Sequence, residues 1–113
     1  MLIVDDEQEL RETLAELLVD EGFDVTMARN GRDGLAQLAE IERPCHVLLD
    51  LYMPGMDGFD FLDALAADDA AAEDVHVVVM TSAPRQAPDD VQVIGKPTTV
   101  DTVLEALDSL PPH

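Results

Sequence analysis

Polar residues suited to phosphoryl and metal chemistry follow the apolar runs of this sequence, at the points where strands would end. They are Asp5, Asp6, Asp50, Thr81, Ser82 and Lys96. Carboxylates that crowd together stay ionised only beside a cation, and a hard divalent ion such as Mg²⁺ is a suitable partner. A carboxylate is also a nucleophile toward phosphorus, and Mg²⁺, an ammonium and a hydroxyl then bind the oxygens of the transferred group. The set predicts a magnesium-dependent phosphoryl-acceptor site.

These residues meet only if the chain forms a parallel sheet, and the hydrophobic pattern favours one. Apolar runs alternate with helical periodicity, which is typical of α/β proteins whose parallel strands are joined by crossover helices. Strands are predicted over residues 2–4, 23–27, 46–51, 75–80 and 91–94. A first helix is predicted over about 7–20, with Leu10, Leu14, Leu17 and Leu18 on its inward side. A second should begin at the N-cap Asn30 and end before Pro44, and a third should lie around Phe59 to Leu65. A last helix should follow the cap Thr99. In such a sheet the strand-end residues lie together beyond the carboxyl edge.

The connection between the fourth and fifth strands is too short for an ordinary crossover helix. Only eight residues, "APRQAPDD" at 83–90, separate Ser82 from Val91, and two of them are prolines. Proline in a helix interior costs ~3 kcal/mol, so no helix longer than about one turn is expected there. The face formed by the fifth strand and the last helix should then expose apolar surface. Such a surface usually marks a site of self-association or of partner docking.

Length, charge and cysteine content limit the remaining classes. The 113 residues suffice for one domain, predicted over 1–113. The formal net charge of −19 repels phosphate backbones and anionic headgroups, so neither nucleic acid nor a membrane surface is an expected partner of this domain. The single Cys45 has no partner for an internal disulfide and is expected to be buried. With no recognisable leader or long apolar span, a cytoplasmic location is expected.

Four motifs lie at the predicted strand ends: "IVDDE" at 3–7, "LLDLYMPGMDG" at 48–58, "VVMTSA" at 78–83 and "IGKP" at 94–97. Together they resemble the receiver domain of two-component response regulators, and the resemblance spans essentially the whole chain. It implies a flavodoxin-like, doubly wound sheet of five parallel strands in the order 2-1-3-4-5, with Asp50 as the phosphoacceptor. By the same resemblance, Asp6 and Asp50 would supply side-chain ligands to Mg²⁺. The Tyr52 backbone carbonyl would supply another, and Asp5 would act through water.

The resemblance also assigns Thr81 as the hydroxyl that responds to phosphorylation and Lys96 as the partner of the phosphoryl group and of the carboxylates. The implied function is that of a phosphoacceptor signalling domain, not of a turnover enzyme. It would take a phosphoryl group from a phosphohistidine of a histidine kinase or histidine phosphotransfer protein and change its partner binding. The sequence departs from the family at Val93, where receivers carry a switching aromatic, and at 83–90, where they carry a full helix.

Two other functions compete with this interpretation. A degenerate receiver would serve as a constitutive docking domain. Val93 and the short connection favour it, whereas retention of the acidic residues and Lys96 argues against it. A haloacid-dehalogenase-like phosphohydrolase also uses a strand-end aspartate with Mg²⁺. That family places a second aspartate two residues after the nucleophile, where this chain has Tyr52, and 113 residues leave no room for a cap domain.

Overall fold

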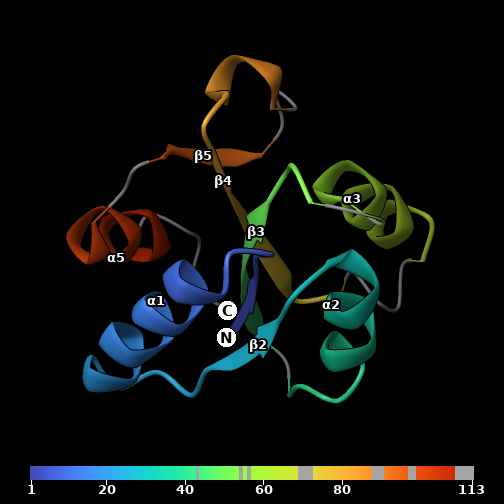
Figure 1. Cartoon of the computed structure of the whole chain (residues 1–113). Helices are drawn as coiled ribbons and strands as arrows, with labels where there is room; N and C mark the ends of the chain where they lie inside the picture. The colour runs from blue at the N-terminus through green and yellow to red at the C-terminus, as the bar shows by residue number, and fades with distance from the viewer. Residues whose placement is uncertain are drawn as a thin grey trace.

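The computed structural model forms one parallel sheet with helices on both faces (Figure 1). It describes residues 1–42, 44–53, 55, 57–68, 73–87, 91–96 and 99–108. The strands are β1 Leu2–Val4, β2 Thr26–Ala28, β3 Cys45–Asp50, β4 Val75–Thr81 and β5 Gln92–Gly95. The helices are α1 Gln8–Asp20, α2 Gly31–Leu38, α3 Gly58–Ala66, the single 3₁₀ turn η1 Pro84–Gln86, and α5 Val100–Asp108. The strand order β2-β1-β3-β4-β5 confirms the predicted α/β sheet.

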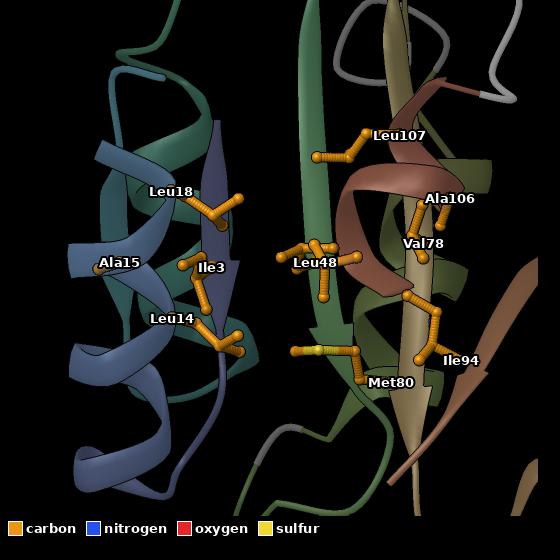
Figure 2. Close-up of a cluster of buried hydrophobic side chains, with 11 residues drawn as sticks. Ile3, Leu14, Ala15, Leu18, Leu48, Val78, Met80, Ile94, Ala106 and Leu107 are labelled. Atoms are coloured by element: carbon orange, nitrogen blue, oxygen red, sulfur yellow. The ribbon is translucent and has the colours of Figure 1, made fainter. Parts of the chain in front are cut away.

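Alternate residues of each strand point to opposite faces of the sheet and build two apolar cores. On one face, α1 and α5 cover Ile3 and Leu48. Figure 2 shows Leu14 and Leu18 of α1 and Leu107 of α5 directed at this part of the sheet. The opposite core, beneath α2 and α3, includes Leu2, Val4, Leu49 and Phe61. The central strands are therefore packed on both sides, which fixes the positions of their carboxyl ends.

The predicted elements are present, with local differences in their bounds. β3 is displaced by one residue toward the N-terminus and β5 by one residue toward the C-terminus relative to prediction, and β4 ends one residue later than predicted. β2 begins only at Thr26, three residues later than predicted. Phe23 and Val25 precede β2 and pack against the core beneath α1. The prediction that Leu17 is buried is wrong, because the buried stripe of α1 runs through Leu14, Ala15 and Leu18 and leaves Leu17 39% exposed.

The predicted helix caps and the buried cysteine are confirmed. Asn30 Oδ1 accepts the Asp33 N–H at 2.8 Å, and Thr99 Oγ1 accepts the Thr102 N–H at 3.3 Å. Cys45 lies 3% exposed at the start of β3. None of the described helices is long and apolar enough to span a membrane.

The β4–β5 connection makes only one turn in the part that the structure describes, which runs to residue 87. This turn, η1 (orange in Figure 1), lies beyond β4 and β5. Its second residue is Arg85 and its last is Gln86, both exposed. The prediction that no helix longer than about one turn forms there is confirmed over residues 83–87.

The face formed by β5 and α5 is open and largely polar. A groove of about 480 Å³ lies between these elements, and its lining includes Gln92, Thr99, Thr102 and Glu105. The apolar residues Val103, Ala106 and Leu107 of α5 are buried in the core. The prediction of an exposed apolar face on α5 is therefore wrong for these three residues, because α5 turns them inward. Val93, Ile94 and Ala106 nevertheless line the groove beside its polar residues.

Candidate functional site

Four strands deliver the predicted site residues to one edge of the sheet. Asp5 follows β1, Asp50 ends β3, Thr81 ends β4 and Lys96 follows β5. The register of β1 on β3 makes Asp5 and Asp50 neighbours across this edge. The Lys96 N–H donates to the Thr81 carbonyl at 2.8 Å, which extends the pairing of β4 and β5 beyond the last strand residue. The convergence predicted from the sequence is therefore confirmed by the backbone.

Three carboxylates gather at this edge. Each of Asp5, Asp6 and Asp50 offers an oxygen, and these oxygens all lie within 4.8 Å of one another. Asp5 is 0% exposed and Asp50 is 6% exposed, whereas Asp6 faces solvent. Three hard oxygen donors at this spacing, two buried and one open to solvent, suit a divalent cation that keeps part of its hydration shell.

Lys96 places a positive charge between the two buried carboxylates. Its Nζ lies 2.9 Å from Asp5 Oδ2 and 3.5 Å from Asp50 Oδ2. Burial disfavours the charge of this ammonium, but the hydrogen bond to Asp5 and the charges of Asp5 and Asp50 outweigh that effect and raise the pKa of Lys96. Lys96 therefore remains protonated and is available to a group attached to Asp50.

The pKa of the Asp50 carboxyl is raised to about 6. Burial is the main cause, because it removes water from the charged form, and the charge of Asp5 adds to the shift. The Lys96 ammonium and the Tyr52 N–H, which lies 3.4 Å from Asp50 Oδ1, oppose the rise without cancelling it. The protein's own positive charge thus under-compensates Asp50, and a bound cation would complete the compensation.

Asp5 is held by three contacts, of which the sequence predicted only the one with Lys96. Its Oδ1 accepts the Glu7 N–H at 2.9 Å, while Oδ2 accepts Lys96, so both of its oxygens are engaged. Its backbone carbonyl accepts Nη1 of Arg11 at 2.7 Å. Arg11 reaches back from the first turns of α1 and fixes the loop that carries Asp5 and Asp6. The only sequence signal for this contact is the position of Arg11, six residues after Asp5.

The loop after Asp50 depends on a close approach of backbone to backbone. Gly58 begins α3, and its N–H donates to the Leu51 carbonyl at 2.9 Å. A Cβ on Gly58 would lie 2.6 Å from the Leu51 Cα and would also meet the Asp50 carbonyl, so no larger residue fits without a shift. Asp57 closes a capping box with Asp60 at the same point. The sequence indicated a turn here but not the steric requirement for Gly58.

A cavity of about 530 Å³ opens above the acceptor. Its lining residues are Asp6, Glu7, Leu10, Asp50, Tyr52, Ser82 and Lys96. Thr81 is fully buried at its edge, and Thr81 Oγ1 accepts the Ala83 N–H at 3.0 Å, which leaves the hydroxyl proton free to be donated. Ser82 is exposed in the lining, and the Tyr52 ring is 43% exposed. Most of the residues predicted for the site therefore line this cavity, whereas Asp5 lies buried against Lys96 and Thr81 is buried next to Ser82.

Comparison with known proteins identifies a family with this arrangement. A family model described as "Response regulator receiver domain" matches residues 1–108. The chain is 38% identical over 104 residues to "DNA-binding response regulator MtrA" of Mycobacterium tuberculosis (strain ATCC 25618 / H37Rv), a match that covers 92% of this chain and 38% of that protein. It is 39% identical over 82 residues to "Sporulation initiation phosphotransferase F" of Bacillus subtilis, covering 73% and 63%. The chain thus spans about two fifths of the length of the first of these curated relatives.

Solved structures share the fold along almost the whole chain. A CheY-like response regulator receiver domain protein from Methanospirillum hungatei is 30% identical, with a TM-score of 0.79 over 92% of this chain and 86% of that one. The response regulator TrrA from Thermotoga maritima, in complex with Mg(2+)-BeF, is 26% identical, with a TM-score of 0.77 over 95% and 94%.

Proposed function

Because the chain belongs to the family of response regulator receiver domains, we propose that Asp50 is its phosphoacceptor and that the donor is a phosphohistidine of a histidine kinase or histidine phosphotransfer protein. One observation carries this assignment. Asp50 lies in the three-carboxylate cluster, with the Lys96 ammonium 3.5 Å away, at the floor of a solvent-accessible cavity. The role is signalling, and we further propose that the domain acts only in its own phosphorylation and dephosphorylation.

The residues at the cavity floor support an in-line transfer. A carboxylate oxygen of Asp50 attacks phosphorus, the phosphorus–nitrogen bond breaks, and its electron pair stays on the imidazole nitrogen of the donor. Lys96 then pairs with an oxygen of the new phosphoryl group. The Thr81 hydroxyl donates a hydrogen bond to another oxygen of that group. Asp5, with both of its oxygens engaged by Glu7 and Lys96, keeps Lys96 oriented rather than reacting itself.

The same residues fit Mg²⁺. Asp6 and Asp50 would provide carboxylate ligands and the Tyr52 backbone carbonyl a third oxygen, with Asp5 acting through water because its oxygens already have partners. The incomplete charge compensation of Asp50 favours such an ion. When bound, Mg²⁺ supplies positive charge to the oxygens of the transferred phosphoryl group. The description of the TrrA structure as a Mg(2+)-BeF complex supports this assignment.

The metal assignment predicts a stabilising effect of magnesium. A ligand that binds only the folded state stabilises it by mass action, so Mg²⁺ should raise the melting temperature of the unphosphorylated domain. Asp6→Ala should remove most of this rise, whereas Asp63→Ala, an exposed acidic residue on α3, should leave it intact. An undiminished magnesium effect in Asp6→Ala would place the ion elsewhere.

A phosphorylation assay tests the acceptor directly. Phosphoramidate, which carries a phosphorus–nitrogen bond, is added with Mg²⁺ and the intact mass is measured. The wild type and the control Asp63→Asn should gain one phosphoryl group, and Asp50→Asn should gain none. Phosphate uptake by Asp50→Asn at the wild-type rate would refute the assignment. Uptake by none of the proteins would favour the degenerate docking domain, whose main support is Val93.

We propose that the partners of this domain are proteins. "DNA-binding" in the name of MtrA describes a protein of which this chain matches 38%, and the net charge of −19 makes the domain itself unsuited to nucleic acid. An effector protein or a second copy of the domain would engage the groove between β5 and α5. The lining of that groove combines the polar residues with Val93, Ile94 and Ala106, so it supports both hydrogen bonding and apolar contact.

A further inference from the structure

Tyr52, two residues after the acceptor, contacts the short β4–β5 connection through its side chain. Its hydroxyl donates a hydrogen bond to Oε1 of Gln86 in η1. Its ring lies edge-on to Phe59 of α3, with the ring centroids 5.9 Å apart. Tyr52 also lines the acceptor cavity, and its backbone N–H lies 3.4 Å from Asp50 Oδ1. One residue therefore joins the acceptor, the cavity wall and the connection.

A second route joins the same two places through Thr81. The Ala83 N–H donates to Thr81 Oγ1 at 3.0 Å, and the Gln86 N–H donates to the Ala83 carbonyl at 3.0 Å. The Thr81 hydroxyl thus holds the start of η1, and η1 holds Gln86. Because Asp50 and Thr81 end the paired strands β3 and β4, the two routes close a ring of contacts around one side of the cavity.

We propose that Gln86 is a positioning residue for the acceptor site: it holds Tyr52 against η1 in the unphosphorylated domain and releases it when Asp50 is phosphorylated. This inference rests on the proposed function of Asp50. To reach a phosphoryl group on Asp50, Thr81 Oγ1 either leaves the Ala83 N–H or draws it along. Both movements displace η1 relative to Tyr52, whose backbone is fixed next to the acceptor at the end of β3.

The short β4–β5 connection passes a movement of Thr81 on to η1. η1 begins three residues after Thr81, so little chain is available to absorb a movement of the hydroxyl. The Tyr52 ring is 43% exposed and can turn into solvent once its hydroxyl is released. Val93, by contrast, is half-buried in β5 and β-branched, which makes its side chain stiff. The aromatic with freedom to move therefore lies after β3 rather than in β5.

Tyr52 provides its own optical signal, because the chain has one tyrosine and no tryptophan. Intrinsic emission is measured for the wild type, Gln86→Met, Gln86→Glu and Arg85→Met. Gln86→Met removes the oxygen that accepts the Tyr52 hydrogen bond and keeps a side chain of similar length. Gln86→Glu keeps an oxygen that can accept this hydrogen bond, and Arg85→Met changes the neighbouring residue of η1. Loss of the hydrogen bond should increase the emission of Tyr52 in Gln86→Met, while the other two variants should match the wild type.

Phosphoramidate and Mg²⁺ are then added, with Asp50→Asn as the control for direct effects of the additives. Emission from the wild type should rise toward the level of Gln86→Met, and Gln86→Met itself should change little. Because the contact stabilises only the unphosphorylated state, and a typical hydrogen bond contributes a factor of a few to an equilibrium, the ratio of phosphorylated to unphosphorylated protein at limiting phosphoramidate should be about threefold higher in Gln86→Met than in the wild type. Gln86→Glu should restore the wild-type ratio.

Intact masses of the same samples separate the two claims. A phosphoryl adduct on the wild type without any change in Tyr52 emission beyond that of Asp50→Asn overturns the inference and leaves the proposed function standing. Equal emission from Gln86→Met and the wild type before the donor is added also overturns it, because the contact then has no effect on Tyr52. Absence of an adduct overturns the proposed function and, with it, the release step.

Discussion

The acceptor site and the β4–β5 connection lie at the same end of the sheet but are built from different kinds of contact. Asp5 and Asp50 are buried, and Lys96 offsets part of their negative charge through contacts of 2.9 and 3.5 Å. In the connection, Arg85 and Gln86 are exposed, and the hydrogen bond of Gln86 to Tyr52 lies at the surface. Buried charges lose much stability when one partner is removed, whereas an exposed hydrogen bond contributes little. The proposed phosphoryl transfer thus depends on strong contacts between buried charges. The proposed relay, which runs from Thr81 through η1 to Tyr52, depends on contacts weak enough to break when Asp50 is phosphorylated.

Lys96→Met should produce the largest loss of stability. It keeps an apolar stem of similar length but leaves Asp5 and Asp50 without their cation, at a cost of about 3 to 4 kcal/mol in the free energy of unfolding without Mg²⁺. Arg85→Met, a change of the same kind in η1, should cost less than about 0.5 kcal/mol. Urea unfolding in the presence of EDTA measures both values. Similar costs for the two variants would remove the distinction between the regions.

Gly58→Ala should be the next most damaging change. The added Cβ meets the backbone of Asp50 and Leu51, which cannot move without shifting the end of β3, so we expect a loss of about 2 to 3 kcal/mol. Gly55→Ala is the matched control in the same loop. Gly55 has a φ of +77° and open space around its Cβ position, so only the backbone conformation is strained, at about 1 kcal/mol. Thermal and urea unfolding should rank the two variants in this order.

Asp50→Asn should stabilise the metal-free domain in a pH-dependent manner. The pKa of Asp50 is raised to about 6 in the folded protein, above the ordinary value of 3.8, so the folded state binds this proton more tightly than the unfolded chain. The contribution of Asp50 to stability is therefore greatest in acid and is lost as the pH rises through about 6. Asparagine has no such loss. The variant should gain about 1 to 2 kcal/mol over the wild type between about pH 5 and about pH 8.

The free energies of unfolding of Asp50→Asn and the wild type are compared at each pH, because the other carboxylates titrate in both proteins and cancel in the difference. Urea unfolding with EDTA supplies the values. Saturating Mg²⁺ should reverse the ranking, since the ion compensates the ionised Asp50 and has one ligand fewer in the variant. A difference that stays constant across this pH range would show that Asp50 titrates normally.

Gln86→Met should have the smallest effect on stability, below about 0.5 kcal/mol, although it alters the relay. This combination sharpens the comparison, because removal of the Lys96 ammonium from the acceptor site should cost several times more stability than removal of the Gln86 amide from η1. A loss above about 2 kcal/mol in urea unfolding would show that η1 is structural rather than responsive.

The sequence was sufficient to predict the strands and the convergence of the site residues because both depend on simple periodic patterns, whereas the strand order came from the family resemblance. A single polar residue after an apolar run identifies a strand end, and parallel strands bring their ends together, so Asp50, Thr81 and Lys96 could be placed without coordinates. The short connection was equally predictable from its length and its prolines. The roles of the individual residues in metal binding and phosphoryl transfer stay predictions, tested by the experiments above.

The features that the sequence did not reveal depend on how separate segments pack. Arg11 contacts the Asp5 carbonyl only because α1 turns it back toward the end of β1. The steric need for Gly58 arises from the approach of α3 to the end of β3. The contact of Tyr52 with Gln86 joins positions 34 residues apart. The prediction of apolar surface on α5 was wrong for Val103, Ala106 and Leu107, because it was inferred from a missing helix, whereas α5 packs these side chains into the core.

The scarcity of positive charge affects which phosphoryl donors can approach the acceptor cavity. Two of the six basic residues, Arg11 and Lys96, contact the single residue Asp5 at the cavity floor, while 25 acidic residues are distributed over the chain. Under the proposed function, a small anionic donor such as phosphoramidate would be repelled over roughly 8 to 10 Å before the cavity floor attracts it. A protein donor with a basic surface would instead pair with the acidic residues around the cavity. The placement of the few cations would then favour protein donors over small phosphorylated anions.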